Sequence, residues 1–206
     1  MSLNKISSRL TPYRFWCLVW LLCLLILALI RWHFGAVVEK EGGLVESFEV
    51  FLIAMIMLAA FWAASLTPYP KNLIWLFLVW LFFIVLMREL NNQDWRLPEL
   101  ILNIATQSEW RFYMTLLGSS LILIAIFRNF LLIWSCRQRF FTSDLPLFGV
   151  ISAVFSLVFG RFFEINIFEI STAIFFEEMS ELTGYFCALL GVWSHRTLFV
   201  SSDSVE

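Results

Sequence analysis

Charged residues are scarce in this chain, and their scarcity decides its class. Only 15% of the 206 residues are Asp, Glu, Lys or Arg, and 61% are hydrophobic, whereas soluble domains rarely exceed about 50% apolar residues. The 23 Phe, the 10 Trp and a mean hydropathy of +0.83 indicate a membrane-embedded protein. The composition excludes a disordered chain, a collagen, a disulfide scaffold and a nucleic-acid-binding domain.

Histidine and cysteine are also rare. His33 lies at the outer end of the first predicted membrane span and His195 at the inner end of the sixth, so they cannot bind the same metal ion. This excludes a His-ligated zinc, haem or copper site. The four cysteines fall inside predicted spans or in an inner loop, without C-x-x-C spacing, so we expect no disulfide. No nucleophile elbow, H-E-x-x-H motif or phosphate-binding loop occurs in the sequence.

Six hydrophobic segments are long enough to cross a bilayer, which requires roughly 20 mostly apolar residues in a helix. Because backbone polar groups inside a membrane must be paired within their own segment, each segment is expected to be helical. We predict an all-α polytopic membrane protein in which residues 1–206 form a single domain, with six transmembrane helices in a single bundle. The predicted spans lie near residues 14–30, 44–66, 72–90, 110–134, 145–163 and 178–193.

The distribution of basic residues predicts the orientation. With the N-terminus inside, the inner segments carry eight Lys or Arg and three Asp or Glu, and the outer segments carry six and thirteen. Lys and Arg are enriched on the cytoplasmic side of membrane proteins. We therefore expect a protein of a bacterial inner membrane with both termini in the cytoplasm. The two outer segments 91–109 and 165–177 are longer than turns. In the first, the amphipathic stretch 97–104 is expected to lie on the membrane surface, and the second is expected to be an interfacial helix or a re-entrant piece.

Glutamates mark the outer ends of several predicted spans. In the sixth span, one helical stripe carries Glu177, Ser180, Glu181, Gly184, Ala188 and Gly191. Small residues are where membrane helices approach one another, so we expect Glu177 and Glu181 to face the bundle interior, with Glu178 beside them. The second span repeats this arrangement, with Glu46 and Glu49 above a stripe of alanines.

We predict that these acids form one polar cluster near the outer face, together with the charged residues at the ends of neighbouring spans. The predicted cluster is Glu46, Glu49, Arg88, Glu89, Arg111, Arg161, Glu164, Glu177, Glu178 and Glu181. A charge at mid-bilayer costs about 2.5–3.5 kcal/mol, so several inward-facing charges favour a functional role. The alternative is structural, because a helix dipole favours acids near its start and Arg–Glu pairs can lock a bundle.

A carboxylate cluster is compatible with three functions. It can bind or translocate a cation or a small polar solute, and a hard divalent cation would use oxygens of Glu46, Glu49, Glu177 and Glu181; no other cofactor is evident. The chain can instead be a non-enzymatic partner or regulatory subunit, in a homo-oligomer or with another membrane protein, since its small-residue faces suit helix packing. The third function is a lipid-active enzyme, which needs a glutamate that titrates near neutral pH.

Three short motifs carry a resemblance. They are Glu41-Gly42-Gly43-x-x-Glu46 before the second span, Arg88-Glu89-Leu90 with Asp94 after the third, and Glu177-Glu178-x-x-Glu181 at the sixth. The chain resembles a loosely defined group of small multi-pass bacterial inner-membrane proteins with E-x-G-x-x-E, R-E-x-D-like and E-E-x-x-E elements. The resemblance implies a shared polar site and names no activity.

Overall fold

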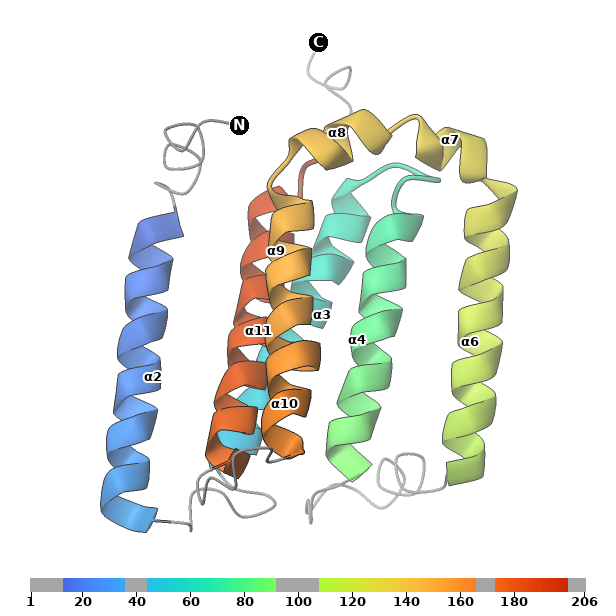
Figure 1. The fold of residues 1–206 in the computed structure, drawn as a ribbon. Coiled ribbons are helices and arrows are strands. Elements are labelled where there is room, and N and C mark those ends of the chain that lie inside the picture. The colour runs from blue at the N-terminus through green and yellow to red at the C-terminus, as the bar shows by residue number, and fades with distance from the viewer. Residues whose placement is uncertain (1–12, 36–43, 92–107, 166–172, 200–206) are drawn as a thin grey trace.

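The computed structural model describes residues 13–35, 44–91, 108–165 and 173–199, and every regular element in these ranges is helical. The long columns of the bundle stand side by side (Figure 1). They are α2 (Arg14–Phe34), α3 (Leu44–Leu66), α4 (Leu73–Asn91), α6 (Ser108–Arg128), the column of α9 (Leu145–Ala153), η3 (Val154–Phe159) and α10 (Gly160–Glu164), and α11 (Ala173–His195). Two short helices, α7 (Phe130–Trp134) and α8 (Arg137–Thr142), cross one end of the bundle between α6 and α9.

Helix α11 lies at the centre of the bundle. It packs against α3 on one side and against the α9–η3–α10 column on another, while α4 packs between α3 and α6. Helices α2 and α6 occupy opposite flanks (Figure 1). Helix α2 is attached by Trp20, which stacks on Phe186 with ring centroids 4.3 Å apart and donates a hydrogen bond of 3.3 Å to Thr183.

The core is built from small residues and a few large rings. Helix α3 buries Ala59, Ala60, Ala63 and Ala64, which lets neighbouring backbones approach closely, as membrane helices require. Trp75 and Phe199 are both fully buried, with ring centroids 5.7 Å apart, at the end where α11 finishes. The core therefore lies among α3, α4 and α11.

Four columns are long and apolar enough to cross a membrane: Arg14–Phe34, Val45–Leu66, Leu73–Leu90 and Leu145–Phe163. A fifth is reached if α6 and the bent segment after it are counted as one span. Helix α11, which carries Glu177, Glu178 and Glu181, is not among them. The chain is thus an all-helical, multi-pass membrane protein with four or five candidate spans in its described part, and six spans in one bundle remain a prediction.

The fourth predicted span, 110–134, is wrong at its inner end. Helix α6 ends at Arg128, and the chain that follows turns away by 74°. The break falls at Asn129, whose side-chain nitrogen donates to the carbonyl oxygen of Ala125 and to the hydroxyl of Tyr69, both at 2.8 Å. Such local side-chain bonds compete with helical hydrogen bonding. The apolar run after Asn129 therefore lies across the end of the bundle.

The structure describes only parts of the two long outer segments. Residues 92–107, which include the predicted surface stretch 97–104, and residues 166–172 lie outside the described residues. Residues 173–177 form the first turns of α11, so this part of the predicted interfacial piece is instead the start of the sixth helix. The fifth predicted span, 145–163, corresponds to the α9–η3–α10 column.

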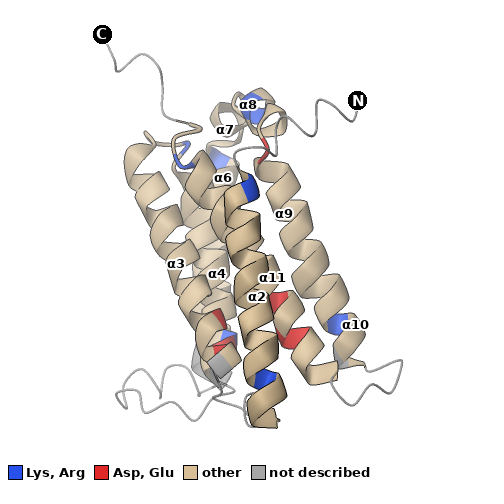
Figure 2. Ribbon diagram, turned by 90° about the vertical axis from the view of Figure 1, so that its left-hand side faces the viewer, with Lys and Arg blue, Asp and Glu red and all other residues tan. Residues whose placement is uncertain are grey.

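The two ends of the bundle differ in charge. The acidic residues of α3 and α11 lie at one level, near the end opposite α7 and α8 (Figure 2); we call this the carboxylate end. The other end, where α2 begins and α11 finishes, carries Lys71, Arg128, Arg137, Arg139 and Arg196. The fold therefore places the chain's acidic and basic helix ends as the sequence pattern predicts.

Candidate functional site

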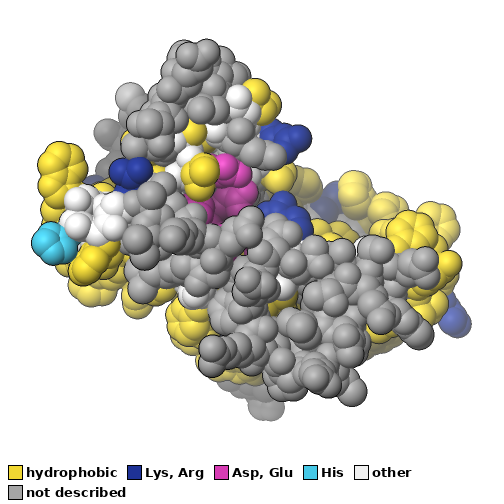
Figure 3. All heavy atoms as spheres, turned by 90° about the horizontal axis from the view of Figure 1, so that it is seen from below, with side chains coloured by type: hydrophobic (Ala, Val, Ile, Leu, Met, Phe, Trp, Pro, Cys, Tyr) yellow, Lys and Arg dark blue, Asp and Glu magenta, His cyan; other side chains and the backbone are white. Residues whose placement is uncertain are grey.

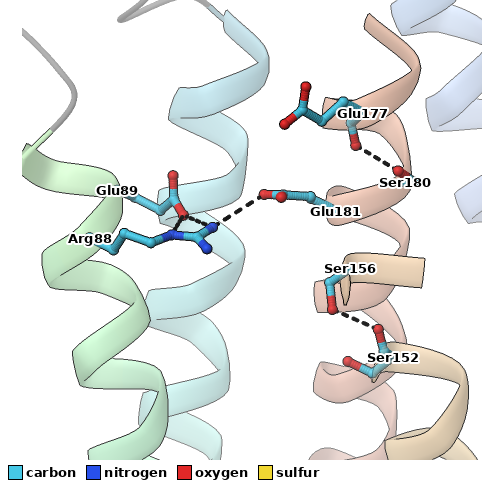
Figure 4. A network of polar contacts seen from close by, with 7 residues as sticks. All are labelled: Arg88, Glu89, Ser152, Ser156, Glu177, Ser180 and Glu181. Atoms are coloured by element: carbon cyan, nitrogen blue, oxygen red, sulfur yellow. Dashed lines mark hydrogen bonds and ion pairs between the residues drawn. The ribbon is translucent and has the colours of Figure 1, made fainter. Parts of the chain in front are cut away.

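An ion pair joins α4 to α11 at the carboxylate end. The Nε and Nη2 atoms of Arg88 donate to Glu89 Oε1 at 3.0 and 2.6 Å, and Nη2 also lies 3.5 Å from Glu181 Oε2 (Figure 4). The side chain of Arg88 is 58% exposed, whereas that of Glu181 is 17% exposed. One arginine is therefore shared by two carboxylates that come from different helices.

Glu49 of α3 is the most deeply buried acidic residue that the structure describes, with 3% exposure. No donor among the described residues lies within hydrogen-bond distance of its Oε1 atom. The carboxylates of Glu181, Glu89, Glu178 and Glu46, in decreasing order of effect, lie close enough to repel a charge on Glu49. We call these five residues (Glu46, Glu49, Glu89, Glu178 and Glu181) the carboxylate cluster.

Tyr185 belongs to the same site, although the sequence analysis did not single it out. It is 5% exposed and lies within electrostatic range of Glu181, Glu89, Glu49 and Arg88. Tyr185 follows Glu181 by four residues, a spacing that places two side chains on the same helix face. The sequence therefore contained the signal that identifies this tyrosine.

The two glycines of α11 face the α9–η3–α10 column. A Cβ atom added to Gly184 would lie 2.9 Å from the carbonyl oxygen of Ser152, and one added to Gly191 would lie 2.8 Å from Cβ of Phe148. Both neighbours are in the α9–η3–α10 column, whereas Glu178, predicted beside the stripe of small residues, lies near Glu49 of α3. Helix α11 therefore has packed helices on two sides.

Glu181 lies at the boundary between these two faces. A Cβ atom added to Gly160 of α10 would lie 3.2 Å from Glu181 Cγ and 3.3 Å from Oε1. The backbone of α10 thus packs directly on the Glu181 side chain, whose other oxygen faces Arg88. Gly160 and Arg88 together hold this carboxylate in place.

The remaining predicted site residues have different locations. Glu177 lies one turn before Glu181, and its carbonyl oxygen accepts a 2.7 Å hydrogen bond from Ser180 (Figure 4). Glu178, which we expected at the edge of the site, also acts on Glu49, after Glu181 and Glu89 in order of effect. Arg161 is exposed on α10, and the side chains of Glu164 and Arg111 lie outside the described residues.

The cluster is centrally placed and mostly acidic. Viewed from the carboxylate end, acidic side chains occupy the middle of the molecule, with basic side chains on either side (Figure 3). Within the described ranges, no three His, Cys, Asp or Glu side chains are already arranged to hold a metal ion. The arrangement offers carboxylate oxygens for positive charge, next to the hydroxyl of Tyr185 and the guanidinium of Arg88.

No protein-family model, curated protein or solved structure matches this chain.

Proposed function

We propose that the carboxylate cluster binds or translocates a cation or a small polar solute at the outer face of a bacterial inner membrane. In this proposal α11 and α6 also cross the bilayer, so that the bundle has six spans. The start of α2 and the end of α11 lie in the cytoplasm. The basic residues at that end of the bundle support this orientation, because Lys and Arg favour the cytoplasmic side.

The observation that carries the proposal is the environment of Glu49. A buried charge is normally paired or bound to a cation, because removing it from water is costly. Arg88 faces Glu89 and Glu181, while Oε1 of Glu49 has no donor. Glu49 therefore presents a buried carboxylate oxygen that no donor among the described residues satisfies, which favours an additional positive ligand.

A purely structural role does not account for Glu49. A helix dipole stabilises acids mainly within the first turn, and Glu49 is the sixth residue of α3. An interfacial residue would extend its carboxylate into water, but Glu49 is almost completely buried. Its position is thus better explained by a ligand than by helix-end electrostatics.

The test is ligand-dependent thermal unfolding of the purified protein in detergent. Mg²⁺, Ca²⁺, Mn²⁺, Na⁺ and protons are varied separately, with choline chloride to hold the ionic strength constant. A ligand at 100 times its Kd stabilises a folded protein by about 2.7 kcal/mol, so a bound cation raises the Tm. We expect Glu181→Gln to weaken this response, because it removes a central charge of the cluster.

Asp144→Asn is the matched control, because Asp144 directly precedes α9 at the opposite end of the bundle. It should leave the response of the Tm unchanged. The proposal fails if the Tm of the wild type is insensitive to every cation and to pH. In that case, a second protein that co-purifies in stoichiometric amount in mild detergent would identify the chain as a partner subunit.

A further inference from the structure

Apolar side chains flank Glu49 along α3, and charged groups of the neighbouring helices face it. One turn to either side of it on α3, Val45 and Ile53 have 0% exposure. The helices packed against α3 are α4 and α11, and Leu182 of α11 is also fully buried. Any ligand of Glu49 must therefore fit between apolar side chains and the other members of the carboxylate cluster.

The charges that face Glu49 come from three helices and are mostly negative. Among the described residues they are Glu46 on its own helix, Glu89 on α4, and Glu178, Glu181 and the ionisable Tyr185 on α11, with Arg88 beside Glu89, Glu181 and Tyr185. The N–H groups on Nε and Nη2 of Arg88 both donate to the same atom, Glu89 Oε1, and Nη2 also faces Glu181. The one guanidinium is thus engaged by two other carboxylates.

We infer that the cation taken by the carboxylate cluster is a proton, held on the carboxyl group of Glu49. This inference rests on the proposed function and specifies its ligand. Binding transfers a proton from hydronium to an oxygen of Glu49 and leaves water behind, and release returns the proton to water. The neutral acid then has an O–H group that can donate to a neighbouring carboxylate.

A proton suits this environment better than a metal ion does. Ca²⁺ takes six to eight oxygen ligands and Mg²⁺ needs near-octahedral geometry, usually with several retained waters. The apolar walls around Glu49 leave few oxygens on one side of it. A proton needs only one oxygen, and it removes the buried charge without adding volume.

The sharing of protons among adjacent carboxylates follows the same electrostatics. When several carboxylates interact strongly, they cannot all be ionised together, and their protons bind to the group in steps. Glu49 is the most deeply buried member, and no donor among the described residues reaches its Oε1, whereas Glu89 and Glu181 have Arg88. The first proton to enter the cluster is therefore assigned to Glu49.

The experiment is infrared spectroscopy of the purified protein in lipid at neutral pH. We expect a carbonyl stretch of a protonated carboxylic acid that shifts in D₂O and decreases at high pH. Glu49→Gln should remove this band. Glu46→Gln, on the same helix one turn earlier and only half-buried, should retain it.

Arg88→Gln provides a second variant in case Glu49→Gln does not fold. Removal of the only guanidinium in the cluster leaves more negative charge uncompensated, so the band should grow. The inference is overturned if the wild type shows no such band, if Glu49→Gln keeps it, or if Arg88→Gln does not increase it. If the band is absent but a metal cation raises the Tm through Glu181, the proposed function stands without this inference; if neither pH nor any metal affects the Tm, both fail.

Discussion

Gly184 is the residue at which α11 approaches the α9–η3–α10 column most closely through backbone. A Cβ atom there would lie 2.9 Å from the Ser152 carbonyl oxygen, 2.9 Å from Ser156 Cβ and 3.0 Å from the Ser156 nitrogen. Two of these three atoms belong to the backbone, which cannot move aside as a flexible side chain can. The identity of this glycine is therefore imposed by the tertiary contact.

We expect Gly184→Ala to lower the stability by about 1–3 kcal/mol, the usual cost of overpacking. The matched control is Gly149→Ala, since a Cβ atom at Gly149 meets nothing within 4 Å. Alanine is favoured over glycine in helices by about 0.5–1 kcal/mol, so the control should be neutral or slightly stabilising. Thermal unfolding in detergent measures both, and equal losses would show that Gly184 is not at a close contact.

Among the elements, the α9–η3–α10 column is distinctive because its middle is π-helical. The π-helical turn, Val154–Phe159, contains Ser156, which contacts Gly184, and it directly precedes Gly160, which contacts Glu181. The Ser156 hydroxyl also donates to the Ser152 carbonyl at 2.7 Å. A π-helical turn accommodates an extra residue within a helix and often occurs at functional sites. Here it lies directly before the segment that positions Glu181.

We expect deletion of Val158, which is 59% exposed, to be tolerated. The column can become a regular α-helix while α10 keeps its face toward Glu181, because the π-helical turn contains the surplus residue. The control is deletion of Leu81, which is 42% exposed in α4. That deletion rotates Arg88 and Glu89 by about 100° relative to α3.

The measurements for this pair are the Tm and its dependence on pH and cations. The Val158 deletion should retain both, whereas the Leu81 deletion should lose the response that depends on the cluster. Equal damage from the two deletions would mean that η3 is a required geometry and not a surplus residue.

At the scale of the whole molecule, the bundle has a central group of helices and two attached flanks. Helix α11 contacts α3 and the α9–η3–α10 column, whereas α6 is attached through α4. The α6 contact uses Gly118 against the ring of Trp80, whose indole donates a 3.1 Å hydrogen bond to Ser119. The carboxylate cluster is supplied by α3, α4 and α11, so its geometry depends on the central group.

We expect Trp20→Ala to weaken the attachment of α2 by about 1–2 kcal/mol. The change removes an aromatic stack, worth about 0.5–1.5 kcal/mol, and an interhelical hydrogen bond, worth about 0.6 kcal/mol in membrane proteins. Trp16→Ala is the control, because Trp16 lies one turn earlier on α2 and is 46% exposed. A lower Tm for Trp20→Ala alone, with the ligand response retained, is the expected result; a lost response would place α2 within the functional unit.

The sequence by itself determined most of the helices and the level of the acidic residues. A run of apolar residues in lipid must pair its backbone internally, so the predicted span 44–66 coincides with α3 and 72–90 agrees with α4 to within one residue. The position of a glutamate at the end of such a run then fixes its level along the bundle axis. Periodicity also indicated the small-residue contacts of α11, among them those of Gly184 and Gly191.

Only the tertiary structure decided which side chains meet. Periodicity assigns residues to faces of an isolated helix but does not say how many neighbours the helix has, and the central position of α11 separated its glycines from Glu178. The end of α6 at Asn129 depends on Tyr69, which is distant in the sequence. The burial of Glu49 beside four other carboxylates likewise results from the packing of α3 against two helices, because local sequence sets the spacing of charges along a helix but not the distance between helices.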